Sequence, residues 1–264
     1  MTLSPRPVFD LDPARIQSLL QTKRYGRSLS VLETTSSTND DARAALELGV
    51  PDGHVIAADS QRSGRGSRGN LWESPAGVDL YVSIIDRPKL SPSHRPLLSL
   101  AAGLGVVYAV ETLIGTRPRP LVKWPNDVWL GERKCAGILI ESISREPAAV
   151  VIGVGLNVNR KHWSSELSQI ATSLIQASNP PQELDRALAL ACLLKEVEHW
   201  VDRLVELGPE PIIAALRERL ALKGALVRCA DVQGRFVGVA ENGAAKIATS
   251  DGIAELMAGT LRPV

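Results

Sequence analysis

Alternating apolar and polar residues, together with short apolar runs, mark most of the chain between residues 28 and 156. These patterns predict strands over residues 28–33, 54–60, 78–85, 121–124, 127–130, 134–141 and 148–156. Apolar residues at three- and four-residue spacing predict helices around 14–21, 40–48, 93–114, 182–207 and 210–220. The main part of the chain is therefore expected to combine strands and helices.

The pattern changes at about Leu222. Short alternating runs at 225–229, 235–240, 244–248 and 259–262 are separated by turn sequences that contain Gly234, Asn242-Gly243 and Asp251-Gly252. Asn-Gly and Asp-Gly pairs between such runs are typical of hairpins. We therefore predict three parts: an arm over residues 1–27, a main domain over 28–221 and a small all-β barrel over 222–264.

Composition and charge exclude several classes of partner. The chain has 264 residues, 44% of them hydrophobic and 22% charged, with a formal net charge of +1. These values are those of an ordinary globular protein and give no sign of a nucleic-acid or membrane-surface partner. The apolar window at 97–110 is expected to be too short to span a bilayer, and residues 1–12 do not resemble a secretion signal.

Cysteine and histidine positions give no sign of a disulfide framework or a structural metal. The three cysteines, Cys135, Cys192 and Cys229, are far apart, and none belongs to a C-x-x-C pair. The four histidines are not grouped with carboxylates at ligand spacing. The reducing cytoplasm is the simplest compartment for such a chain.

A glycine- and arginine-rich loop follows the strand at 54–60. It reads Gly64-Arg-Gly-Ser-Arg-Gly69, and successive backbone N–H groups in such a loop can bind an anion. Arg65 and Arg68 add charges that suit phosphate oxygens, so we interpret the loop as one that closes over a nucleoside triphosphate. A dinucleotide fingerprint requires a helix directly afterwards, and a Walker A loop requires Gly-Lys-Ser/Thr; neither follows. A plain hairpin loop remains the alternative.

Three other segments carry candidate chemistry. The hydroxyl-rich run 34–39 precedes a helix for which Thr38 or Asn39 is a good N-cap, and its surplus of uncharged polar groups suits a neutral cyclic urea or amide. Lysines and an Asn-Asp pair are concentrated in the hairpin region 120–141, where they can converge on one pocket. Gly153 and Gly155 suit close approach of a strand to a flat ligand, or simple packing in a crowded sheet.

Four of these motifs together resemble the biotin protein ligase family. They are the loop 64–75, Lys123-Trp-Pro-Asn-Asp127, Arg133-Lys-Cys-Ala-Gly137-Ile-Leu-Ile-Glu141 and Gly153-Val-Gly-Leu-Asn157, in this order. The resemblance runs from about Ser28 to the C-terminus. It implies an α/β (α+β) catalytic domain with a mixed sheet of the class II synthetase-like type, followed by an SH3-like β-barrel.

The resemblance also implies a two-step reaction. Biotin and ATP with Mg²⁺ give biotinyl-5′-AMP, and a lysine of a biotin carboxyl carrier protein, such as that of acetyl-CoA carboxylase, then accepts the biotin. The resemblance implies no tightly bound cofactor and no nucleic-acid or membrane partner. The protein can be a monomer or a homodimer. Lipoate–protein ligase and a non-catalytic biotin-sensing regulator are the alternatives, although a hydroxyl-rich pocket suits the ureido ring of biotin better than a dithiolane.

The family's site residues carry over to matching positions of this sequence. Catalytic roles fall on Lys134, Arg65 and Asp127, with Lys134 between the biotin carboxylate and the α-phosphate. Biotin contacts fall on Ser37, Thr38, Asn39, Gln61, Gly64, Arg65, Gly66, Ser67, Lys134, Gly137, Gly153 and Gly155. Nucleotide contacts fall on Arg68, Trp72, Lys123, Asn126 and Asn157, and no metal ligand is assigned.

Two departures from the family pattern lead to further expectations. Ser67 stands where the bacterial members have arginine, which predicts weaker retention of the reactive adenylate. Only about 27 residues precede the first predicted strand, in place of the winged helix-turn-helix of the bifunctional members, so a ligase without the repressor role is expected.

Overall fold

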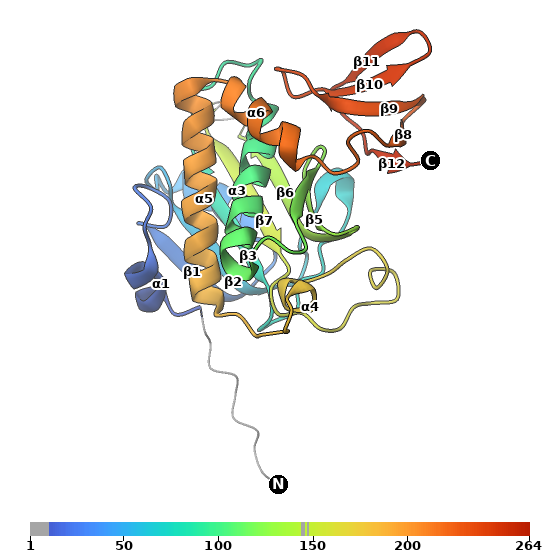
Figure 1. Ribbon diagram of the computed structural model, residues 1–264. Coiled ribbons are helices and arrows are strands. Elements are labelled where there is room, and N and C mark those ends of the chain that lie inside the picture. Colours follow the sequence, from blue (N-terminus) through green and yellow to red (C-terminus); the bar gives the residue numbers. More distant parts are fainter. Residues whose placement is uncertain (1–10, 144–145, 147) are drawn as a thin grey trace.

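A seven-stranded mixed sheet forms the centre of the larger part of the molecule (Figure 1). The computed structural model describes residues 11–143, 146 and 148–264. The strands are β1 (Leu29–Thr35), β2 (Val55–Gln61), β3 (Leu80–Asp86), β4 (Pro120–Lys123), β5 (Asp127–Leu130), β6 (Arg133–Ser142) and β7 (Val150–Leu156). Their order is β1-β2-β3-β7-β6-β5-β4, in which β1 and β2 are parallel and all other neighbours antiparallel. Each of the seven strands predicted for the main domain is present, with its ends shifted by two residues or fewer.

Helices cover both faces of this sheet. Helices α3 (Leu97–Ile114) and α5 (Arg186–Leu207) lie side by side across one face, and α6 (Glu210–Arg219) packs against both (Figure 1). Helix α2 (Thr38–Glu47) packs on the opposite face, against β2, β3 and β7. The described residues also form two short helices, α1 (Pro13–Leu19) and α4 (Leu174–Ala177), and a 3₁₀ turn over Ser67–Gly69. The α3–α5 face holds the large apolar core, whereas a small cluster that includes Ala42, Ile56 and Val151 lies under α2.

Helix starts differ from the predicted ones for local reasons. Helix α5 begins at Arg186 rather than 182, because the carboxylate of Asp185 accepts the N–H groups of Ala187 and Leu188 at 3.0 and 3.3 Å. Helix α2 has Ser37 at its N-cap, not Thr38 or Asn39. The latter two lie in the first turn, where their side chains bond with other elements instead of capping the helix.

Helix α3 corrects the expectation for the apolar window at 97–110. It has 18 residues with a mean hydropathy of 1.9, which makes it long and apolar enough to cross a membrane. Its residues are mostly buried within the protein, however, and it packs extensively against α5 and against β4, β5 and β6. A core helix covered on both sides has the same composition as a membrane span, because both environments exclude water.

A second, five-stranded antiparallel sheet forms the C-terminal unit. It contains β8 (Leu226–Cys229), β9 (Val232–Val239), β10 (Ala245–Thr249), β11 (Gly252–Leu256) and β12 (Arg262–Pro263), in the order β11-β10-β9-β8-β12. Gly243 and Gly252 have φ angles of 87° and 126° at the predicted hairpin turns. The arrangement is compatible with the predicted SH3-like module, while the exact boundaries of the three parts stay a prediction.

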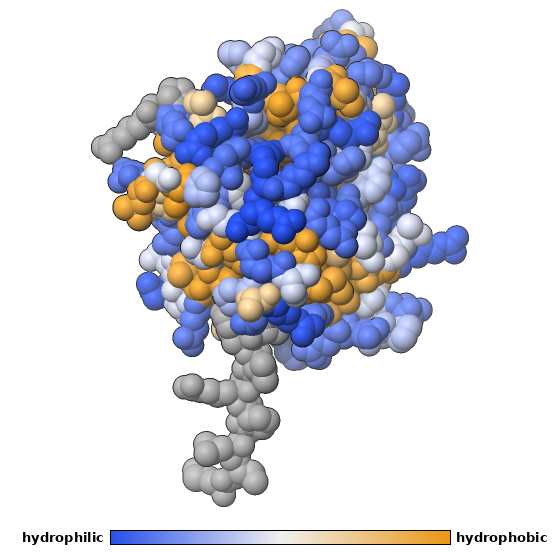
Figure 2. Space-filling model, turned by 90° about the vertical axis from the view of Figure 1, so that its left-hand side faces the viewer, coloured by the Kyte–Doolittle hydropathy of each residue, from blue (hydrophilic) through white to orange (hydrophobic). Residues whose placement is uncertain are grey.

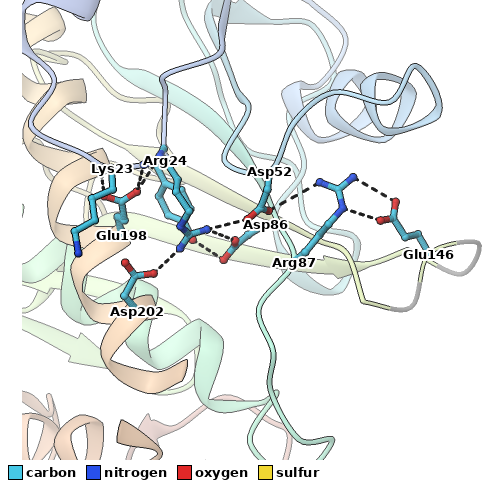
Figure 3. Close-up of polar contacts among 9 residues, drawn as sticks. Lys23, Arg24, Asp52, Asp86, Arg87, Glu146, Glu198 and Asp202 are labelled. Atoms are coloured by element: carbon cyan, nitrogen blue, oxygen red, sulfur yellow. Dashed lines mark hydrogen bonds and ion pairs between the residues drawn. The ribbon is translucent and has the colours of Figure 1, made fainter. Parts of the chain in front are cut away.

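The segment 11–27 is anchored to the main domain by buried apolar side chains and by a polar network. Leu11, Ile16 and Tyr25 are fully buried. The Glu198 carboxylate on α5 accepts the N–H groups of residues 23, 24 and 25 at 2.6, 2.6 and 2.9 Å, and Arg24 donates to Asp86 at 2.8 Å (Figure 3). Residues 1–10 of the predicted arm lie outside the described residues.

The side of the molecule that carries α1 and β1 is mostly hydrophilic, and its apolar residues form separate patches (Figure 2). Strand β1 is the edge of the sheet here, and its residues 29–32 are only half-buried.

Candidate active site

One small cavity on the α2 face of the sheet brings together most of the predicted site residues. It lies between the start of α2, the glycine loop and the strands β3, β6 and β7, and has a volume of about 40 Å³, room for a few water molecules. The predicted residues that line it are Ser37, Thr38, Asn39, Gln61, Arg65, Gly66, Ser67, Trp72, Asn126, Lys134, Gly137, Gly153 and Gly155.

The period-two geometry of β7 separates the cavity from the core. Ile152, Val154 and Leu156 point into the apolar core under α3 and α5. The alternate positions, Gly153 and Gly155, therefore face α2 and the cavity. Glycine there removes side chains that would otherwise fill the space.

The close approach expected at these glycines is made by the protein's own side chains. A Cβ atom on Gly153 would lie 2.4 Å from Oδ1 of Asn39, and one on Gly155 would lie 2.4 Å from Cε2 of Trp72. Gly137 pairs with Gly155 across β6 and β7, and it too lies against the indole. Gly137 and Gly155 thus form a flat floor on which Trp72 rests, beside the predicted biotin contacts.

A bulge in β6 turns Lys134 toward the cavity. Val128 pairs with Ala136, but the next residue, Trp129, pairs with Lys134, so Cys135 is an extra residue in the ladder. Cys135 is buried in the core, as predicted, and burial raises the pKa of its thiol to about 12. Because the bulge shifts the alternation, Lys134 shares a face with Gly137.

The Lys134 ammonium group lies between an acid and an aromatic ring. Its Nζ is 2.6 Å from Oδ1 of Asp127 and 5.2 Å from the ring centroid of Trp72. The ammonium group is therefore held by an ion pair on one side and by a cation–π contact on the other. The side chain is about a third exposed, so a ligand in the cavity can reach it.

The hydroxyl-rich run is held by a polar network. The Ser83 hydroxyl on β3 donates to Oδ1 of Asn39 at 2.6 Å and hydrogen-bonds with Oγ1 of Thr38 at 2.8 Å. Gln61 accepts the N–H of Thr38 at 2.9 Å, and its amide nitrogen donates to Ser74 at 2.8 Å. Ser37, Thr38 and Asn39 are each less than 5% exposed. Their positions are therefore fixed before a ligand arrives.

The glycine loop folds back on itself and covers the cavity. The N–H of Trp72 donates to the carbonyl of Gly64 at 2.9 Å, and a Cβ on Gly64 would lie 2.4 Å from the Trp72 carbonyl oxygen. Arg65 pairs with Asp40 and Glu141 on the rim. The Nε atom of Arg65 and the Nε1 atom of Trp72 are buried donors with no hydrogen-bond partner among the described residues, which suits both for an acceptor on a ligand.

The loop also contacts the C-terminal unit. Arg68 has a left-handed backbone conformation with φ of 60°. Its guanidinium group donates to the carbonyl of Gly259 and to the hydroxyl of Thr260. Arg68 therefore does not line the cavity in this conformation.

The other predicted nucleotide contacts are divided between two environments. Asn126 lines the cavity while its amide donates to the Ile138 carbonyl at 2.9 Å. Asn157 is buried and donates to the Thr172 carbonyl at 3.0 Å, outside the cavity. Lys123 is also buried, 5.1 Å from the ring of Trp129, and burial lowers its pKa in spite of the attraction of Asp127.

Several residues of the site were not assigned from the sequence. Ser83 and Tyr81 on β3, and Asp40 and Glu141 on the rim, contact predicted residues or line the cavity. The sequence of β3 carries a signal for Ser83, because this polar residue interrupts a run of apolar ones. Glu141 belongs to a quoted motif, but its distance from Arg65 along the chain concealed the contact.

Within residues 11–143, 146 and 148–264, no group of three His, Cys, Asp or Glu side chains is placed to hold a metal ion.

Comparison with known proteins assigns the chain to a family. Residues 31–157 match the model of the biotin/lipoate A/B protein ligase family. The chain is 32% identical to the bifunctional ligase/repressor BirA of Bacillus spizizenii over 255 residues, which cover 93% of this chain and 77% of that protein. It is also 36% identical over 206 residues to the biotin–[acetyl-CoA-carboxylase] ligase of Mycobacterium tuberculosis, covering 76% and 74% of the two chains. The chain belongs to the biotin protein ligase family.

Structural comparison confirms the fold of the family. The biotin protein ligase of Aquifex aeolicus, solved in complex with biotin and ATP, superposes with a TM-score of 0.81 at 29% identity, over 90% of this chain and all of that one. The predicted α/β fold class with an additional β module is therefore confirmed.

Proposed function

We propose that this member of the biotin protein ligase family activates biotin with ATP to give biotinyl-5′-AMP and transfers the biotin to a specific lysine of a biotin carboxyl carrier protein. One observation carries the proposal: the ammonium group of Lys134 reaches the same cavity as the fixed polar side chains of Ser37, Thr38 and Asn39. A neutral polar head and an anionic tail can thus be bound together, and only biotin among the two candidate acids has both.

The first step joins two anions. A carboxylate oxygen of biotin attacks the α-phosphorus of ATP, the bond to the β-phosphate oxygen breaks, and pyrophosphate leaves. Biotin's carboxylate is already ionised at neutral pH, so the protein has to supply position and positive charge rather than a base. Lys134 would stabilise the charge that grows on the phosphorus oxygens, and Arg65 would neutralise the carboxylate from the loop side.

The second step needs an approach from solvent. The neutral amine of the carrier's lysine attacks the acyl carbon, the bond to the phosphate oxygen breaks, AMP leaves and the amine loses a proton. Lys134 lines the cavity with about a third of its side chain exposed, so the acyl–phosphate junction beside it would be reachable. Its ammonium would then stabilise the departing AMP.

Cations around Lys134 would receive the triphosphate. Burial lowers the pKa of Lys123 most, and the positive charges of Lys134, Arg68 and Arg262 lower it further. The negative charge of Asp127 raises it. Such a cluster repels itself, and an anionic ligand relieves the repulsion. ATP would bring Mg²⁺ with it as part of the substrate, and Lys123, Arg68 and Asn126 would contact the nucleotide.

The buried end of the cavity would bind the ureido ring. Ser37 and Thr38 would provide hydroxyl groups, and the Asn39 amide and Gln61 a further polar wall. The Trp72 indole would pack along the valeryl chain or turn toward the adenine. The proposed partner is a carrier domain such as that of acetyl-CoA carboxylase, and no nucleic acid is expected to bind. The protein would act in the cytoplasm as a monomer or a homodimer.

The test is transfer of radiolabelled biotin to a purified carrier domain, with and without ATP·Mg. We expect label on the carrier only with ATP, and expect lipoate to replace biotin poorly. Failure to label the carrier, or stronger activity with lipoate, would overturn the proposal. A gel shift with a biotin-operon operator tests the expectation that DNA is not bound.

A further inference from the structure

The carboxylate of Glu141 connects the glycine loop with the polar end of the cavity. Its Oε2 atom accepts the amide Nδ2 of Asn39 at 2.6 Å and lies 3.1 Å from Nη2 of Arg65. Its Oε1 atom pairs with Arg43 of α2. The Glu141 side chain is only 18% exposed, so its ion pair with Arg65 is shielded from water more than a surface pair.

A second acid holds the same guanidinium group. Asp40, in the first turn of α2, lies with Oδ1 at 2.8 Å from Nη2 of Arg65. Arg65 therefore forms ion pairs with Asp40 on α2 and with Glu141 on β6. We call this arrangement of Arg65, Asp40 and Glu141 the loop catch.

The loop catch fixes more than the loop. Because an ionised carboxylate only accepts hydrogen bonds, Glu141 forces Asn39 to present its NH₂ group to the rim. The Asn39 carbonyl oxygen then accepts from Ser83, at 2.6 Å. Ser83 also bonds to Thr38, which bonds to Gln61 at the start of the loop. One chain of polar contacts thus joins Arg65 in the loop to Gln61 at its start, through residues that line or support the cavity.

The catch leaves one face of Arg65 for a ligand. Its Nη2 atom is taken by the two carboxylates, whereas its buried Nε atom has no partner in the described part of the chain and the residue lines the cavity. A guanidinium group held in this way presents a fixed N–H donor to an anion. The two acids also lower the net positive charge of the loop before the substrates bind.

We propose that Asp40 and Glu141 are positioning residues that hold Arg65, and with it the closed glycine loop, over the reactive adenylate. Glu141 also orients the Asn39 amide. Binding of the ureido ring at the polar end of the cavity would therefore favour the closed loop. The inference rests on the proposed function. In this chain, whose loop has Ser67, retention of biotinyl-AMP would depend on the ion pairs that Arg65 forms with Asp40 on α2 and Glu141 on β6.

The test compares Glu141→Gln and Asp40→Asn with the wild type. Both variants keep the size of the side chain and remove its charge, and the amide introduced by Glu141→Gln can still accept from Asn39 through its carbonyl oxygen. Glu146→Gln is the matched control, because Glu146 forms an ion pair with Arg87 at 2.7 Å outside the cavity (Figure 3). Preformed complexes with radiolabelled biotinyl-AMP are mixed with an excess of unlabelled biotinyl-AMP, and the rate at which the label dissociates is measured.

We expect Glu141→Gln to speed dissociation about tenfold and Asp40→Asn about threefold, with the control unchanged. In a double-mutant cycle with Arg65→Gln, the effect of Glu141→Gln should disappear, because the catch is already absent. Tryptic cleavage after Arg65 and Arg68 should also be faster in both variants, at an unchanged melting temperature.

Two outcomes would overturn the inference: dissociation from Glu141→Gln within twofold of the wild type, or additive effects in the cycle. A wild type that forms no biotinyl-AMP from biotin and ATP·Mg would instead contradict the proposed function. The two failures are distinguishable, because the first is measured only after the wild type has formed adenylate.

Discussion

The ammonium nitrogen of Lys134 lies 2.6 Å from a carboxylate oxygen of Asp127 on the neighbouring strand. The pair is only partly buried, with 31% and 18% of the two side chains exposed, so the lysine is positioned without being sealed off. A substrate carboxylate or phosphate that enters the cavity can share the ammonium group with Asp127. This relationship makes Lys134 the first residue to test.

Replacement of Lys134 by alanine should lower the rate of adenylate formation about 10²–10³-fold, because one charged donor to the developing transition state is lost. Biotin-dependent exchange of pyrophosphate into ATP measures this step directly. The melting temperature should change little, since a partly exposed side chain is removed.

Lys223→Ala is the control, because Lys223 is an exposed lysine that donates to the Arg217 carbonyl and does not line the cavity. Near-normal exchange by the Lys134 variant would remove this residue from the proposed mechanism.

Gly155→Ala should weaken the binding of biotin, because the new methyl group would lie 2.4 Å from the Trp72 indole and push it off its floor. We expect KM for biotin to rise about tenfold or more, with a smaller change in kcat. Steady-state kinetics of both parameters is the measurement.

The matched control is Gly103→Ala in α3, where the nearest atom lies 3.6 Å from the added Cβ, an ordinary contact distance. Equal kinetic effects of the two substitutions would show that the floor under Trp72 is unimportant.

Ser67→Arg should slow the release of biotinyl-AMP. Ser67 lines the cavity, and a guanidinium group there would add a charged donor near the phosphate. Dissociation of labelled adenylate from the wild type and the variant decides the matter; identical rates would disprove that Ser67 weakens retention.

Asp79 should make the protein less stable as the pH rises from about 4 to about 6. Burial raises the pKa of Asp79 from 3.8 to about 6, although the N–H of Val158 donates to it at 2.8 Å. Between these pH values the folded state binds more protons than the unfolded state, so the free energy of unfolding falls as the pH rises. The full effect is about 3 kcal/mol.

Urea unfolding between pH 4 and pH 7 tests this relation, with Asp79→Asn for comparison. The variant should lack this component of the pH dependence, because its side chain does not titrate. Parallel stability curves for the two proteins would contradict the prediction.

The strands and the motifs could be predicted from local patterns. The alternating and apolar stretches of the main domain became strands because their apolar side chains pack into the clusters on the faces of the sheet. The hydroxyl run and the glycine loop follow β1 and β2 and lie at one cavity. Helix starts were less predictable. Asp185 caps α5, so this helix begins at Arg186, four residues after the start of its apolar pattern. Thr38 and Asn39 bond to partners on β2 and β3 instead of capping α2.

By itself, the sequence determined which residues can bind an anion and a neutral polar head, since those properties belong to side chains and to local turns. Tertiary structure alone decided that Cys135 is an extra residue in the β6 ladder, which turns Lys134 from the core face to the cavity. It also brought Glu141, 76 residues further along the chain, to Arg65. Neither the bulge nor the ion pair can be predicted from the local sequence, because strand register and the pairing of distant segments depend on the packing of the whole sheet.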